Sequence, residues 1–223
     1  MHDLTVVFDL DGTLVETAPD LIGATNHALG LCNLEPVAPG EIRPFISFGA
    51  RAMIRKGLEF HGHHVPDSEF ETLFSSFIAY YAENIAVESH VFPGLGDSLA
   101  RLCARGARLA VCTNKQEALS RRLLDALGIS GLFAAVAGRD TFPVCKPHPD
   151  HLLGAIRLAS GDARRAVMVG DSDVDIATAK AAGVPVVAVT FGYTDVPVAA
   201  LSPDATIDHY RDLEDAIDRI RAR

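Results

Sequence analysis

Near the beginning of the chain, residues 6–14 read VVFDLDGTL. The apolar, β-branched start of this stretch predicts a buried strand in a parallel sheet that is covered on both faces. Asp9 and Asp11 follow at i and i+2, and on an extended chain such side chains leave from the same side. Two like charges held together cost energy unless a cation or a shared proton relieves them. The stretch therefore predicts a site for a hard cation and an anionic substrate.

Composition and charge exclude several classes of protein. The chain has 223 residues, 48% of them hydrophobic, and no apolar run approaches the roughly 18 residues of a membrane span. Its start lacks the basic and apolar regions of a signal peptide. A net charge of −9 argues against a nucleic-acid binder. The four cysteines form no CxxC pair, which is typical of reduced thiols and predicts a cytoplasmic protein.

Residues 17–86 carry helical periodicity. Helices are expected over residues 19–31, 50–60 and 68–84. The last of these has Phe70, Leu73, Phe74, Phe77, Ile78 and Tyr81 on one face. Ser68 and Glu71 predict a capping box at its start. This block is expected to form a small helical subdomain.

From residue 91 onward, strands alternate with helices, which predicts βαβ units and a parallel sheet. Strands are expected over residues 108–113, 134–138, 166–170, 185–190 and 205–208, and helices over 95–105, 116–127, 149–159, 173–182 and 212–222. The first strand must rejoin this sheet. We therefore predict a Rossmann-like α/β core formed by residues 1–15 plus 88–223, with residues 16–87 inserted as a helical cap.

Ligands of open parallel sheets bind beyond the carboxyl ends of the strands, and polar residues gather there in this sequence. They are Asp9 and Asp11 after the first strand, Thr113 and Asn114 after the strand at 108–113, Asp171, Asp173 and Asp175 after the strand at 166–170, and Lys146 in a loop. Taken alone, a strand-end threonine is usually a helix cap and a lysine a solvated charge. Their coincidence at several strand ends favours one shared site.

These residue types suit phosphoryl transfer with Mg²⁺. Mg²⁺ prefers oxygen ligands, and Asp9, Asp171 and the backbone carbonyl of Asp11 would supply them. Asp9 could attack phosphorus, because a carboxylate is able to act as a covalent nucleophile. Asp11 would protonate the leaving oxygen and then activate water. The Thr113 hydroxyl would hold phosphoryl oxygens, and Lys146 would neutralise the charge of the phosphoryl group.

The order of four motifs, DxDGT at 9–13, Thr113, Lys146 in KPxP and GDSxxD at 170–175, resembles the haloacid dehalogenase superfamily of phosphatases along essentially the whole chain. The helical insertion after the first motif is similar to the C1-type cap of that superfamily. Within it, stretches such as FDLDGTLVETAPDL, VCTNK and CKPHPDHLL resemble phosphoglycolate phosphatases.

The resemblance implies a role for individual residues. Asp9 would be nucleophile and metal ligand, Asp11 acid/base and ligand through its carbonyl, Asp171 a metal ligand, and Thr113, Asn114 and Lys146 phosphoryl-binding residues. Asp175 is expected to hold a metal-bound water or Lys146, with direct coordination as the alternative. Arg51 in the cap is the candidate for gripping a substrate carboxylate, with Arg43 and Arg55 as competitors.

The expected function is Mg²⁺-dependent hydrolysis of a small phosphorylated metabolite of carbohydrate metabolism, with 2-phosphoglycolate as the first candidate, by a monomer or homodimer. Sugar phosphates, nucleotide monophosphates and pyrophosphate remain alternative substrates, and a phosphomutase shares all four motifs. A dehalogenase would need no Asp11, and the single cap lysine, Lys56, lies on an exposed-looking helix, which argues against a phosphonate hydrolase. A receiver-type signalling module would be about half as long, without the insertion.

Overall fold

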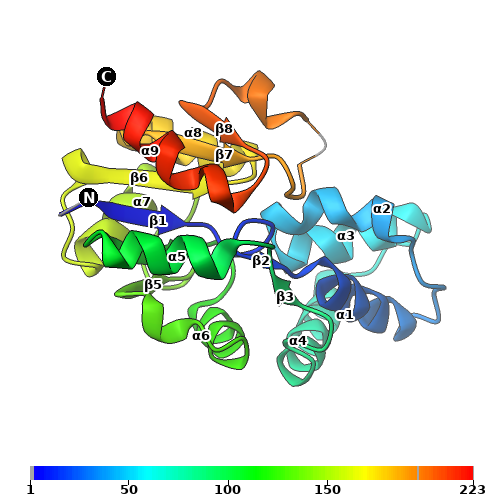
Figure 1. Ribbon diagram of the computed structural model, residues 1–223. Helices are drawn as coiled ribbons and strands as arrows, with labels where there is room; N and C mark the ends of the chain where they lie inside the picture. The colour runs from blue at the N-terminus through cyan, green and yellow to red at the C-terminus, as the bar shows by residue number, and fades with distance from the viewer. Residues whose placement is uncertain (1–2, 195, 223) are drawn as a thin grey trace.

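A computed structural model describes residues 3–194 and 196–222 of the chain. Its core is a sheet with the strand order β5-β4-β1-β6-β7-β8, in which every neighbouring pair runs parallel. The strands are β1 (Thr5–Phe8), β4 (Arg108–Cys112), β5 (Ala135–Ala137), β6 (Ala166–Gly170), β7 (Val186–Val189) and β8 (Ala205–Ile207). The first strand of the chain thus lies in the middle of the sheet (Figure 1), and the predicted fold class is confirmed.

Both faces of the sheet are buried, which explains the continuous apolar character of β1. Val6 and Phe8 belong to one hydrophobic cluster, and Val7 belongs to the cluster on the opposite face. Val7 lies opposite Ala110 of β4 and Met168 of β6. Because β1 lies between β4 and β6 in the middle of the sheet, the carboxylates that follow it begin near the centre of the sheet edge.

Helices of the core cover the two faces. They are α5 (Leu95–Ala104), α6 (Glu117–Ala126), α7 (Pro149–Leu158), α8 (Asp173–Ala182) and α9 (Leu213–Arg221). Helices α5 and α9 pack together on one face and α7 and α8 on the other (Figure 1). None of the helices within residues 3–194 and 196–222 combines the length and apolar character that crossing a membrane requires.

The inserted segment is helical, as predicted. It contains α1 (Ala18–Gly30), α2 (Pro39–Ile42), a 3₁₀ turn at Arg43–Phe48, α3 (Ala50–Phe60) and α4 (Asp67–Glu83). Helix α1 packs against both α3 and α4, and this group lies to one side of the sheet (Figure 1). The apolar face of α4 is buried through Phe70, Leu73, Phe77 and Tyr81.

A short antiparallel ribbon, which was not predicted, joins the insertion to the core. Strand β2 (Val15–Glu16) pairs with β3 (His90–Val91), so the chain leaves and re-enters the core side by side. The ribbon lies where we placed the boundary between residues 1–15 plus 88–223 and the cap at 16–87. That division remains a proposal, and the ribbon supports it.

The capping box predicted for α4 is wrong. The helix begins at Asp67, one residue before Ser68, and the preceding Pro66 makes no side-chain capping bond. Glu71 instead accepts two hydrogen bonds from Arg51 of α3. The pattern indicated the helix, but the tertiary partner of Glu71 could not be read from local spacing.

Asp20 fixes the junction between α1 and the returning chain. Its carboxylate is 7% exposed and accepts hydrogen bonds from the Ser89 hydroxyl at 2.6 Å and from the Ser89 amide at 2.8 Å. The amide of Glu88 donates to both carboxylate oxygens at 3.1 Å. One side chain thus satisfies three donors where the cap meets the core.

Asp20→Ala should lower the free energy of unfolding by about 2–3 kcal/mol, because it leaves buried donors without an acceptor. Urea denaturation would measure the change. The matched control is Asp125→Ala on the exposed surface of α6, with an expected change within about 0.5 kcal/mol. Equal effects of the two substitutions would show that Asp20 does not hold the junction.

Candidate active site

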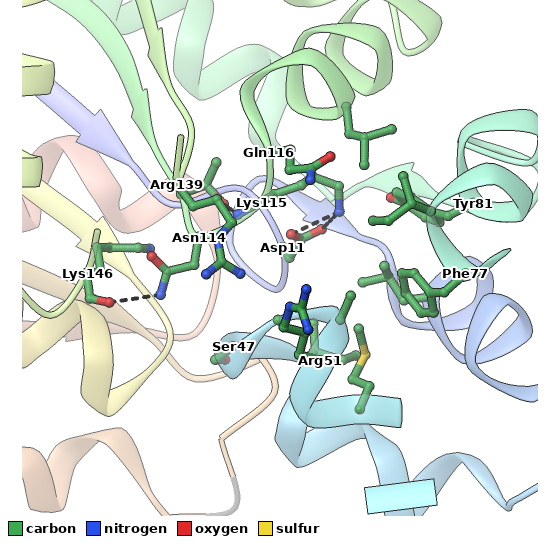
Figure 2. Close-up of a pocket in the computed structure, with 18 of the residues that line it drawn as sticks. Asp11, Ser47, Arg51, Phe77, Tyr81, Asn114, Lys115, Gln116, Arg139 and Lys146 are labelled. Atoms are coloured by element: carbon green, nitrogen blue, oxygen red, sulfur yellow. Dashed lines mark hydrogen bonds and ion pairs between the residues drawn. The ribbon is translucent and has the colours of Figure 1, made fainter. Parts of the chain in front are cut away.

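The carboxyl ends of three neighbouring strands place the predicted residues in one site. Asp9 follows β1, Thr113 and Asn114 follow β4, and Asp171 follows β6. With Lys146, from the loop between β5 and α7, several of these residues line a pocket of about 250 Å³ between the sheet and the cap helices. Figure 2 shows core residues entering this pocket opposite Phe77 and Tyr81 of α4.

Lys146 lies at the centre of a buried charge cluster. Its ammonium group donates to Asp9 at 2.7 Å and to Asp175 at 2.6 Å, and the residue is 5% exposed. Burial alone would lower the pKa of Lys146, but the carboxylates of Asp175 and Asp9 raise it. Lys146 is therefore a permanent positive charge beside Asp9.

A third buried carboxylate joins this cluster. Asp9, Asp171 and Asp175 each offer one carboxylate oxygen as a possible metal ligand, and these three oxygens lie within 4.8 Å of one another. Burial raises the pKa of Asp9 to about 7, although Lys146 acts in the opposite direction. Burial and the neighbouring carboxylates of Asp175 and Asp9 raise the pKa of Asp171 well above its ordinary value. Three carboxylates face one ammonium group, which is the charge pattern expected for a cation site.

Neighbouring groups hold Asp171 and Asp175 in different ways. Asp171 accepts hydrogen bonds from the Thr13 hydroxyl and the Tyr193 amide, both at 2.8 Å. Asp175 forms a capping box with Ser172 at the start of α8, and its other oxygen accepts from Lys146. Asp175 thus contacts Lys146, as one of the predicted alternatives has it. Tyr193, in the loop after β7, was not predicted as a site residue, because it contacts Asp171 through its backbone amide, a group that every residue except proline carries.

Asp11 faces a partner that the sequence analysis missed. Strand β1 ends at Phe8, so Asp9 and Asp11 lie just beyond it, and their carboxylates engage different lysines. Asp11 accepts from Lys115 at 2.8 Å and 3.1 Å and from the Thr17 hydroxyl at 2.7 Å. Lys115 directly follows Thr113-Asn114 at the end of a predicted strand, and this position could have indicated that it belongs to the site.

Lys115 also bridges the core and the cap. Its side chain is 6% exposed, and its ammonium nitrogen lies 4.5 Å from the centre of the Tyr81 ring. Burial alone would lower the pKa of Lys115, but Asp11 and Tyr81 raise it. Figure 2 shows the ion pair between Lys115 and Asp11 beside the aromatic side chains of Tyr81 and Phe77. A sequence pattern could not indicate this contact, because it depends on where α4 packs.

Thr113 and Asn114 lie at the rim of the charge cluster. Thr113 is 2% exposed, and its hydroxyl accepts a hydrogen bond from the Lys115 amide at 3.2 Å. The Asn114 side-chain amide donates to the Lys146 carbonyl at 3.1 Å. Its buried Oδ1 has no partner among residues 3–194 and 196–222. Their binding of phosphoryl oxygens remains a proposal.

Arg51, the candidate carboxylate-binding residue, lines the same pocket but already has a partner. Two of its nitrogens donate to the two Glu71 oxygens, each at 2.7 Å. Its guanidinium group also lies 4.1 Å from the centre of the Phe74 ring. Both terminal nitrogens of the Arg51 guanidinium group thus bind Glu71 within the cap. Substrate binding by Arg51 stays a prediction.

Comparisons with known proteins agree with this geometry. A family model described as haloacid dehalogenase-like hydrolase matches residues 6–189. A phosphoglycolate phosphatase of Mesorhizobium japonicum is 48% identical over 205 residues, which cover 92% of this chain and 90% of the relative. One of Agrobacterium fabrum is 43% identical, over 95% of this chain and 91% of the relative.

A solved structure shares the whole architecture. The crystal structure of a predicted phosphoglycolate phosphatase from Haemophilus somnus 129PT aligns with a TM-score of 0.90 and 32% identity, covering 97% of this chain and 98% of that one. The predictions of the superfamily and of an enzyme are therefore confirmed. From its motifs, its sheet order and these relatives, the chain belongs to the haloacid dehalogenase-like hydrolase family.

Proposed function

We propose that this enzyme hydrolyses 2-phosphoglycolate to glycolate and phosphate, with Mg²⁺ as cofactor and a phosphorylated Asp9 as intermediate. The observation that carries the proposal is the buried group formed by Asp9, Asp171, Asp175 and Lys146 at the carboxyl edge of the sheet. Such a group combines a carboxylate nucleophile, oxygen ligands and a fixed positive charge.

The donor set fits Mg²⁺. Its side-chain ligand atoms are all carboxylate oxygens. The raised pKa values of Asp9 and Asp171 show that burial and neighbouring carboxylates disfavour the ionised forms, which a bound cation would stabilise. Asp9, Asp171 and the carbonyl of Asp11 would hold the ion. Asp175 is occupied by Lys146 and Ser172, which supports a role outside the direct ligands. Bound Mg²⁺ would supply positive charge to the phosphoryl oxygens.

The chain's own residues would carry out two displacements at phosphorus. In the first, a carboxylate oxygen of Asp9 bonds to phosphorus as the bond to the substrate oxygen breaks, and Asp11 donates a proton to that oxygen. In the second, Asp11 takes a proton from water, whose oxygen bonds to phosphorus as the Asp9–phosphorus bond breaks. Thr113 and Asn114 would orient the phosphoryl oxygens, and Lys146 would offset their charge.

The pocket supports a small, highly anionic substrate. Four basic side chains line it, Arg51, Lys115, Arg139 and Lys146, although the chain as a whole carries a net charge of −9. Positive charge gathered in a cleft attracts anions, and a phosphate monoester with a carboxylate carries two anionic groups. The named activity of the similar proteins supports the same substrate.

A cytoplasmic location is part of the proposal. All four cysteines are free thiols, which is typical of proteins in a reducing compartment. The oligomeric state, a monomer or homodimer, remains a prediction from the sequence. The role in carbohydrate metabolism remains one as well.

Phosphate release from a panel of esters tests the substrate. With Mg²⁺, kcat/KM for 2-phosphoglycolate should exceed that for pyrophosphate, sugar phosphates and nucleotide monophosphates by about 100-fold or more, because two anionic groups are bound at once. Excess chelator should abolish turnover, and Asp9→Asn should lower kcat by at least about 1,000-fold. A higher kcat/KM for another ester would contradict 2-phosphoglycolate as the substrate. Full activity in excess chelator would contradict the role of Mg²⁺.

Gly192→Ala tests whether the placement of Asp171 matters. An added Cβ at Gly192 would overlap the side chain of Asp171, so one of the two must move. We expect kcat/KM to fall about 10- to 100-fold and the Mg²⁺ concentration for half-maximal activity to rise. Gly131→Ala is the matched control, because a Cβ there meets nothing within 4 Å.

Circular dichroism should show that both glycine variants are folded. If Gly192→Ala has the Mg²⁺ dependence of the wild type, Asp171 does not hold the metal in the proposed way.

A further inference from the structure

The basic side chains of the pocket differ in whether a carboxylate already neutralises them. Lys146 is paired with Asp9 and Asp175, and Lys115 is paired with Asp11. Arg51 is paired with Glu71 through two hydrogen bonds. Each of these three cations already has a carboxylate partner, in a buried pair for Lys146 and Lys115 and in an exposed pair for Arg51.

Arg139 is the exception among these cations. Its side chain makes no hydrogen bond and no ion pair within residues 3–194 and 196–222, and it lines the pocket from the core side. Figure 2 shows it directed into the pocket opposite Arg51. An uncommitted guanidinium group in an active-site cleft can bind an incoming carboxylate without first breaking an ion pair.

The backbone around Arg139 is held firmly. Its amide donates to the Lys115 carbonyl at 2.9 Å, and the following Asp140 accepts from the Glu117 amide at 2.8 Å. A Cβ on the preceding Gly138 would overlap the backbone of Glu117, so the two segments are in close contact. The origin of the Arg139 side chain is thus fixed relative to the residues that follow β4, including Asn114.

The short length of the substrate also favours Arg139. In 2-phosphoglycolate only one oxygen and one carbon separate the phosphorus from the carboxylate, so both anionic groups must be bound within a small space. Arg139, Asn114 and Lys146 line a second cavity together, which places Arg139 beside the phosphoryl-binding side of the site. Its guanidinium nitrogen would lie 3.8 Å from a Cβ added to Gly49, where the cap reaches the core.

We propose that Arg139 binds the carboxylate of the substrate and thereby selects carboxylated phosphate monoesters. The inference rests on the proposed function and replaces Arg51 by Arg139 as the specificity-determining residue. Arg139 belongs to the core, and its guanidinium reaches the place where Gly49 of the cap meets the core. Arg51 then serves to hold α3 against α4 through Glu71.

The test compares two esters that differ in the carboxylate, 2-phosphoglycolate and ethyl phosphate, in wild type, Arg139→Ala, Arg139→Lys and the matched control Arg51→Ala. Arg139→Ala should lower kcat/KM for 2-phosphoglycolate about 100-fold, mainly through KM, because a bidentate charge-assisted contact is lost. Activity on ethyl phosphate should change less than about 3-fold. Arg139→Lys should restore part of the loss, and Arg51→Ala should leave the ratio between the esters near that of the wild type.

The remaining outcomes distinguish an error in the role of Arg139 from an error in the proposed substrate. If the wild type prefers 2-phosphoglycolate and Arg139→Ala keeps that preference, the inference is wrong and the proposed function stands. Equal losses on both esters would assign Arg139 to the phosphoryl group and overturn the inference. If the wild type shows no preference for the carboxylated ester, the proposed substrate is wrong, and the inference falls with it.

Discussion

The burial of three carboxylates around one ammonium group is the constraint on which the site depends. Asp9, Asp171 and Asp175 are each at most 5% exposed, and Lys146 is the cation that contacts two of them. Taking such charges out of water costs several kcal/mol per ion unless partners offset it. The remaining negative charge makes the folded site a receptor for a cation, and the same charge keeps Lys146 protonated beside the nucleophile.

The surrounding fold serves this arrangement. The parallel sheet brings the ends of β1 and β6 together, so Asp9 and Asp171 meet although they are far apart in the sequence. The glycines at 12 and 192 leave room for the Asp171 carboxylate. Lys115 contacts both Asp11 and the ring of Tyr81 in α4, so the proposed acid/base is linked to the position of the cap.

The core and most of its site could be predicted because their signals are local. Strands, helices and strand-end residues follow from periodicity and from the rule that ligands bind at the carboxyl edge of a parallel sheet. Side-chain partners that depend on how helices pack together could not be predicted. Glu71 at a helix start suggested a capping box, yet it pairs with Arg51, because the packing of α3 on α4 decides its neighbour. Lys115 directly follows Thr113-Asn114, but its contacts with Asp11 and Tyr81 depend on where α4 packs.

The most direct test of the account is rapid-quench detection of the phosphorylated enzyme. A single turnover of 2-phosphoglycolate carrying radioactive phosphorus would be stopped with acid on the millisecond scale, and the labelled peptide identified by mass spectrometry. The account predicts label on Asp9 that appears before free phosphate and then decays into it. Label on another residue, or free phosphate formed with no labelled protein at any time, would contradict the role of Asp9 as nucleophile.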